Sequence, residues 1–398
     1  MLTSLALILL VGLAAASVCR ALRLPPMVGM LAAGILLGPH ALNLLDGSIL
    51  GISADLRQMA LVIILIKAGL SLRPMDLKQV GRPALLMSFL PASFEIAAFV
   101  LLAPVVFGVS RLEAAIMGSV LGAVSPAVVV PRMVRLMEEG RGAGKGVPQL
   151  VLAGASLDDV FVIVLFGTFL GMAQGEGASA AGLARVPASI LLGIAGGILA
   201  GLAQHLLFDA RYTKGRAVRN STKTIVILSA AFLLVALQGT LEHMVPFSGL
   251  LAVMAMACAL RVRSPGPVAA RLSEKFGKLW IAAEVLLFVL VGAAVEIRYT
   301  LAAGWRAMLM ILLALVFRSA GAALCLLGTR LNAGERLFCV ISYLPKATVQ
   351  AAIGGVPLAV GLPCGRLVLS MAVLAIVLTA PLGAWGMDAF YRQLLRRD

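Results

Sequence analysis

The 398-residue chain carries 33 Lys and Arg against 18 Asp and Glu, a net charge of +15, and 61% of its residues are hydrophobic. Soluble domains contain about 25% charged residues, whereas this chain contains 13% and has a mean hydropathy of +1.04. This composition excludes a soluble enzyme with one core and indicates a membrane protein with many spanning segments. The five cysteines and three histidines show no metal-ligand spacing, so we expect no structural zinc, disulfide framework or cofactor.

Apolar runs recur along the whole chain, and a spanning helix needs about 20 such residues. We predict about thirteen spans and a single transmembrane domain over residues 1–398, because no linker divides the chain. The first run lacks a basic leading segment, so it is interpreted as a span rather than a signal peptide. The runs are 2–19, 26–44, 56–72, 83–107, 112–134, 148–173, 186–208, 223–239, 247–262, 279–297, 304–328, 335–360 and 367–390.

The basic residues test this count, because cytoplasmic loops are rich in Lys and Arg. Alternate loops collect 24 of them on one side and six on the other, and three lie within apolar runs. A miscounted span would scramble that asymmetry. We therefore predict an odd number of spans, with the N-terminus outside and the C-terminus cytoplasmic. The +15 charge then reflects topology and anionic lipid rather than nucleic acid, and the short loops favour a bacterial plasma membrane.

Two adjacent carboxylates, Asp158 and Asp159, lie in the apolar run 148–173. An ionisable group at the bilayer centre costs about 2.5–3.5 kcal/mol, so it is usually functional or paired. Adjacent positions point to different faces of a helix, which leaves one carboxylate hard to pair. Such a pair holds either a small cation or a proton, and this competition is the minimal chemistry of an antiporter. The alternative is that each aspartate belongs to a structural ion pair.

Prolines interrupt two other runs. Pro126 and Pro131 lie in the run 112–134, within a Ser125–Pro131 interruption, and Pro345 lies 219 residues after Pro126. A freed backbone in a span is tolerated where it lines a cavity, and paired broken helices mark the midplane site of inverted-repeat transporters. The breaks lie in the fifth and twelfth runs, a step of seven, and this odd step predicts that the two repeats run in opposite directions. The alternative is that the prolines only kink their helices.

Three further charges lie deep in apolar runs. Lys346 follows Pro345 and could reach one of the two aspartates; the alternative is an ammonium that extends to the interface. Glu95 and Arg318 occupy matching places in the two repeats, 223 residues apart, and are predicted to form a structural ion pair.

The segments VSPAVVVP (124–131), SLDD (156–159) and LPKATVQAAIG (344–354) occur together in this chain. With them the chain resembles, over essentially its whole length, the monovalent cation:proton antiporter superfamily and within it the NHA-type sodium/proton antiporters. The resemblance implies an all-α membrane fold of inverted repeats with two crossed broken helices. It also implies a homodimer, with a dimerisation part (about 1–73 and 220–297), a linker helix (about 186–208) and a mobile core (about 82–173 and 304–390) that moves like an elevator.

The resemblance also implies roles for the site residues. Asp159 looks like the main Na⁺ carboxylate and Asp158 like the partner of Lys346, while Ser125 and Thr348 at the two breaks complete the cation and proton site. The aspartate pair with a lysine implies electrogenic exchange of Na⁺ or Li⁺ for H⁺.

Other functions remain open from the sequence. K⁺/H⁺ exchange would use the same scaffold, because selectivity depends on ligand spacing that a sequence does not give. A bile-acid-type sodium-coupled organic anion symporter is a further alternative, although such a carrier needs no adjacent aspartate pair facing a lysine. The chain has no HExxH motif and no evident Ser-His pair, so an intramembrane enzyme is not expected.

Overall fold

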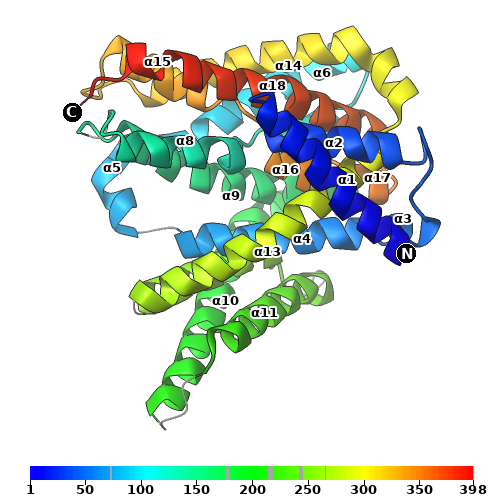
Figure 1. Cartoon of the computed structure of the whole chain (residues 1–398). Helices are drawn as coiled ribbons and strands as arrows, with labels where there is room; N and C mark the ends of the chain where they lie inside the picture. Colours follow the sequence, from blue (N-terminus) through cyan, green and yellow to red (C-terminus); the bar gives the residue numbers. More distant parts are fainter. Residues whose placement is uncertain are drawn as a thin grey trace. The chain divides into compact units, whose positions relative to one another are not determined.

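The computed structural model describes residues 1–71, 74–142, 144–174, 180–213, 218–241, 245–264 and 266–397 (Figure 1). These ranges contain eighteen helices and no β-strand beyond one isolated bridge between Arg141 and Arg397. The predicted all-α fold is therefore confirmed. The helices are α1 Leu2–Ala21, α2 Pro26–Leu37, α3 Gly47–Gly51, α4 Ser53–Ser71, α5 Pro74–Met87, α6 Leu90–Phe107, α7 Arg111–Leu121, α8 Pro126–Glu138, α9 Val147–Ala173, α10 Ala180–Thr213, α11 Asn220–Leu241, α12 Gly249–Arg263, α13 Gly266–Ala293, α14 Ile297–Cys325, α15 Ala333–Ser342, α16 Thr348–Ile353, α17 Val356–Ala359 and α18 Gly365–Leu394.

Each of the thirteen predicted runs coincides with a helix or with an interrupted series of helices. By length and composition, nine segments in the described part of the chain could cross a membrane. The remaining runs fall short for separate reasons. Helices α2 and α12 have only 12 and 15 residues, α4 carries three charged side chains, and α15, α16 and α17 are separated by turns. The number thirteen thus stays a prediction.

The two broken spans begin alike. Helix α7 starts with a capping box, in which Glu113 N donates to Ser110 Oγ at 3.2 Å and Ser110 N donates to the Glu113 carboxylate at 2.8 Å. Helix α15 starts with the same arrangement between Asn332 and Glu335, both bonds 2.8 Å long. These reciprocal bonds satisfy amides that the first turn leaves free. Ser110 and Asn332 are 222 positions apart, close to the predicted repeat offsets of 219 for Pro126 and Pro345 and 223 for Glu95 and Arg318.

Both spans then lose helical structure. Helix α7 ends at Leu121 and α8 begins at Pro126, while α15 ends at Ser342 and α16 begins at Thr348. The two breaks touch, because Ser125 N donates to Pro345 O at 2.8 Å. The predicted crossing of two broken helices is therefore confirmed.

The first break is shorter than the sequence suggested. Pro131 lies inside α8, so the interruption spans residues 122–125 rather than 125–131. Pro126 occupies the first turn of α8, where a missing N–H costs nothing. Pro345, in contrast, lies within the second break itself.

Contacts divide the chain into two compact units. The first contains Met1–Arg57, Asp76–Gln174 and Val285–Asp398, and in it α6 packs against α7 and α14, and α7 against α9. The second contains Gln58–Met75 and Gly175–Glu284, and in it α12 packs against α10 and α11. The predicted dimerisation part, linker helix and mobile core are defined by how they move relative to one another, whereas these two units are defined by contacts. The predicted division therefore stays a prediction.

Candidate cation site at the helix crossing

Five charged side chains meet inside the first unit. Glu95 lies on α6, Asp158 and Asp159 on α9, Arg318 on α14, and Lys346 in the second break. None of the five is more than 9% exposed, and Asp158, Arg318 and Lys346 are fully buried. Buried charges need partners, because desolvating an isolated ion is costly. The partners show what each residue can do.

Arg318 connects the acids to the breaks. Its Nη1 donates to Glu95 Oε2 at 3.0 Å, and its Nη2 donates to Asp158 Oδ2 at 2.9 Å. Its Nε donates to Tyr343 O in the second break at 2.6 Å, and Nη1 also donates to Gly122 O in the first. The planar fork of a guanidinium suits such a junction, since its donors point in fixed directions. Arg318 thus fixes both carboxylates relative to the crossing.

Lys346 has a different partner from the one expected. Its Nζ donates to Glu95 Oε2 at 2.7 Å and to Leu121 O at 2.5 Å, and no ion pair within 4.0 Å joins it to Asp158. The expectation that Lys346 pairs with Asp158 is therefore corrected. Asp158 Oδ2 is already held by Arg318 and by Val124 N at 2.8 Å.

The carbonyl groups at the end of α7 also accept hydrogen bonds from Lys346 and Arg318. Residues Leu121–Ala123 would leave their carbonyl oxygens free, because a helix end has no following turn to donate to them. Lys346 donates to the first, Arg318 to the second, and Gln350 Nε2 donates to the first and third at 3.2 and 2.9 Å. A helix carboxyl end is partly negative and favours cations. These side-chain bonds stabilise the broken backbone.

Asp159 is the exception among the five. It has no ion pair within 4.0 Å in the described ranges, and its Oδ1 is buried without a hydrogen-bond partner. With all groups ionised, three carboxylates face two cations, which leaves the cluster one negative charge in excess. One monovalent cation or one proton at Asp159 would balance it.

Several oxygen atoms at the crossing are also buried and unpartnered within the described structure. Four of them belong to residues predicted to bind the cation and the proton: Ser125 Oγ, Asp158 Oδ1, Asp159 Oδ1 and Thr348 Oγ1. Ser125 precedes α8 and Thr348 begins α16, and neither hydroxyl caps its helix. Carboxylate, hydroxyl and carbonyl oxygens are the ligands that hard cations prefer. These residues therefore fit a small cation as a transported substrate.

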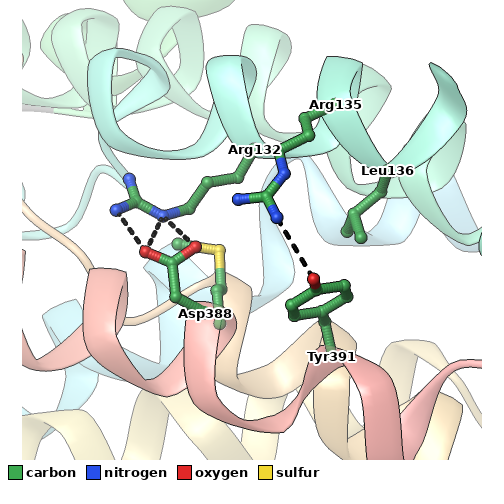
Figure 2. Close-up of a pocket in the computed structure, with 6 residues that line it drawn as sticks. Arg132, Arg135, Leu136, Asp388 and Tyr391 are labelled. Carbon is green, nitrogen blue, oxygen red and sulfur yellow. Dashed lines mark hydrogen bonds and ion pairs between the residues drawn. The ribbon is translucent and has the colours of Figure 1, made fainter. Parts of the chain in front are cut away.

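A second polar cluster joins α8 to α18, as Figure 2 shows. Arg132 Nη2 lies 2.8 Å from Asp388 Oδ2, and Arg135 Nη2 donates to the Tyr391 hydroxyl at 3.1 Å. The Arg132 and Asp388 side chains are 25% and 47% exposed, and pairs in contact with solvent stabilise a protein little. Its charges have partners outside the crossing, so we assign this cluster to packing between helices.

Sequence reasoning missed three residues at the crossing. Gln350 clamps the end of α7, Tyr343 places its carbonyl and its ring against Arg318, and the Thr379 hydroxyl accepts from Lys346 N at 2.9 Å. The only available signal was the spacing of Gln350, four residues after Lys346. An uncharged polar residue in an apolar run gives no stronger indication.

Comparison with known proteins places the chain in a family. Residues 5–387 match the family described as "Sodium/hydrogen exchanger, transmembrane". The chain is 33% identical over 375 residues to "Sodium/hydrogen exchanger 9B2" of Mus musculus, covering 91% of this chain and 66% of the mouse protein. It is 34% identical to the Xenopus tropicalis protein of that name, covering 83% and 62%, and 32% identical to the Homo sapiens one, covering 91% and 68%. The chain thus spans just under two thirds of the first two relatives.

Solved structures agree on the fold. The structure of the sodium proton antiporter MjNhaP1 from Methanocaldococcus jannaschii at pH 8 matches with a TM-score of 0.84, covering 98% of this chain and 97% of that one at 20% identity. At such low identity the match establishes the fold alone. The family match over nearly the whole chain carries the conclusion further: this chain belongs to the sodium/hydrogen exchanger family of transmembrane proteins.

Proposed function

We propose that the chain exchanges Na⁺ or Li⁺ for H⁺ across the membrane, with Asp159 as the carboxylate that holds the cation and the proton in turn. The observation that carries this proposal is a buried carboxylate with no cationic partner in the described structure, beside one that Arg318 already neutralises. The relatives' names, which refer to sodium and hydrogen, support the same exchange.

The charge balance suggests how exchange is enforced. An uncompensated buried charge is costly, so the cluster is stable with a proton on Asp159 or with a cation beside it. The two occupants compete for the same carboxylate. A site that crosses the membrane only when Asp159 is occupied therefore exchanges the cation for a proton at this carboxylate.

The proposed movement is an elevator-like displacement of the core, in a homodimer of a plasma membrane with the N-terminus outside. Several hydrogen bonds support the proposal that the two breaks move together as one rigid body. Ser125 N bonds to Pro345 O, and Arg318 bonds to Gly122 O and Tyr343 O, so both breaks share one rigid junction. The proposed orientation rests on the uneven distribution of basic residues between the two sides.

A pH-gradient dequenching assay in proteoliposomes tests the substrate. We expect addition of Na⁺ or Li⁺ to dissipate a preformed proton gradient, because the site offers oxygen ligands to a small dehydrated cation. K⁺ at the same concentration should give little response. A response to K⁺ alone would favour the K⁺/H⁺ alternative, sodium-driven uptake of a bile acid without proton movement would favour the symporter, and no response to any cation would contradict the proposal.

Electrogenic exchange, with two protons for each Na⁺, requires a second proton carrier, and we propose Lys346. Glu95 Oε2 accepts from both Lys346 Nζ and Arg318 Nη1, so Lys346 can lose its proton without leaving Glu95 unpaired. We expect Lys346→Gln to retain Na⁺/H⁺ exchange but to lose its response to an imposed membrane potential. Lys145→Gln is the control, because Lys145 is 44% exposed and pairs with Glu335. A variant at Lys346 that keeps the wild-type response to voltage would leave this residue with a structural role.

A further inference from the structure

Gln350 joins the two breaks through an uncharged amide side chain. It lies on α16, is fully buried, and follows Lys346 by four residues. Its Nε2 donates to Ala123 O at 2.9 Å and to Leu121 O at 3.2 Å. Both partners are acceptors, so the NH₂ group must face them. The Oε1 atom of the same amide takes part in neither bond.

That oxygen has no hydrogen-bond partner in the part of the chain that is described. An unsatisfied buried acceptor costs about 1–3 kcal/mol, a cost that an apolar side chain of similar volume would avoid. Two donated bonds explain why an NH₂ group is present, but they leave the oxygen unexplained. Ser125, Asp158, Asp159 and Thr348 each have a similar unpartnered oxygen at the same crossing.

We infer that Gln350 is a further ligand and a specificity-determining residue of the cation site, where its Oε1 coordinates the dehydrated monovalent cation. This inference rests on the proposed function, whose site it completes. The clamp on Leu121 O and Ala123 O fixes the amide, and therefore its oxygen, relative to the first break. Because selection among hard cations depends on cavity size and on the number and rigidity of ligands, a fixed carbonyl oxygen favours one ionic radius.

Cation binding is measured directly by the rise in melting temperature of the purified full-length protein with added Na⁺, Li⁺ or K⁺, since an ion that binds only the folded state stabilises it. Gln350→Met removes both the oxygen and the NH₂ group at similar length. We expect this variant to need about tenfold more Na⁺ for the same rise, equivalent to about 1.4 kcal/mol, with a matching increase in the Na⁺ KM for exchange. A lower melting temperature without cation, with unchanged Na⁺ dependence, would overturn the inference and leave Gln350 as a structural clamp.

Gln204→Met is the matched control. Gln204 on α10 is also buried, donates from Nε2 to Met256 Sδ at 3.2 Å, and has an unpartnered Oε1, but it belongs to the second unit. We expect its variant to keep the wild-type Na⁺ dependence. An equal loss in both variants would overturn the inference, because the effect would then follow from any buried amide.

Gln350→Asn tests specificity, because it withdraws the oxygen by one methylene group. A wider site should weaken Li⁺ binding more than K⁺ binding, so the preference should move toward the larger cation. An unchanged preference overturns the specificity-determining role. If no monovalent cation stabilises the wild-type protein, the proposed function fails together with this inference, whereas wild-type stabilisation that Gln350→Met leaves unchanged rejects the inference alone.

Discussion

Asp159→Asn should abolish cation-driven proton movement in proteoliposomes while the protein still folds. An asparagine side chain neither binds a proton nor supplies a negative charge, so neither of the proposed occupants has a site. Folding should survive, because Asp159 has no ion pair within the described ranges and the substitution removes the excess negative charge. Dequenching by Na⁺ and Li⁺ measures exchange, and thermal unfolding measures stability.

Asp388→Asn is the matched control for Asp159→Asn, since it makes the same chemical change at a 47% exposed side chain on α18. Its exchange should stay close to wild type, and its melting temperature should fall little. Asp158→Asn should behave differently from both, with a lower yield of folded protein, because Asp158 accepts from Arg318 and from Val124 N. Exchange that persists in Asp159→Asn would remove Asp159 from the transport cycle.

The fold could be predicted from the sequence because a membrane limits the possible structures. Backbone groups in lipid must bond within their own segment, so each apolar run had to become a helix or an interrupted helix. The breaks could be predicted from Pro126 and Pro345, because the sequence distance between these prolines is similar to the distance between the matching charged residues of the two repeats. Their ends were not visible, because Pro131 lies inside α8 instead of interrupting it.

The charged residues of the site could be found individually, whereas their pairing could not. Glu95, Asp158, Arg318 and Lys346 were each conspicuous in an apolar run, but Glu95 and Lys346 are 251 positions apart in sequence. The pairing depends on which face of each helix points toward the crossing. It also depends on the guanidinium group of Arg318, which donates to Asp158 in the place expected for Lys346. Such orientation is set by packing against neighbouring helices, and apolar periodicity carries little information about it when a helix is hydrophobic on every side.

Polar residues without charge were the least predictable part of the site. The hydrogen bonds of Gln350, Tyr343 and Thr379 involve backbone carbonyl and amide groups that are free to bond only because the spans are broken. A sequence shows that a break frees such groups, but it does not show which side chain satisfies them. This is why Gln350 was identified only from the structure, although Ser125 and Thr348, which lie one and three residues from a proline, were predicted.

Glu95→Ala should sharply reduce the yield of folded protein, by the equivalent of about 3–5 kcal/mol, the usual result of removing one member of a buried ion pair. Glu95 is 1% exposed, and its Oε2 accepts from Lys346 at 2.7 Å and from Arg318 at 3.0 Å. Arg318 keeps Asp158, but Lys346 keeps only the Leu121 carbonyl among its side-chain partners in the described structure. Size-exclusion yield and thermal unfolding in detergent measure the loss.

A double substitution separates the stability effect from a role in transport. Replacing both members of a buried pair by uncharged groups is often neutral, so adding Lys346→Met to Glu95→Gln should recover part of the stability that Glu95→Gln alone loses. Glu274→Ala is the control, because Glu274 is 64% exposed and pairs with Lys278 on the same helix; its yield should match wild type. If Glu95→Ala instead folds normally but transports no cation, Glu95 belongs to the ion pathway, and the negative charge that the proton and the cation share is not confined to Asp159.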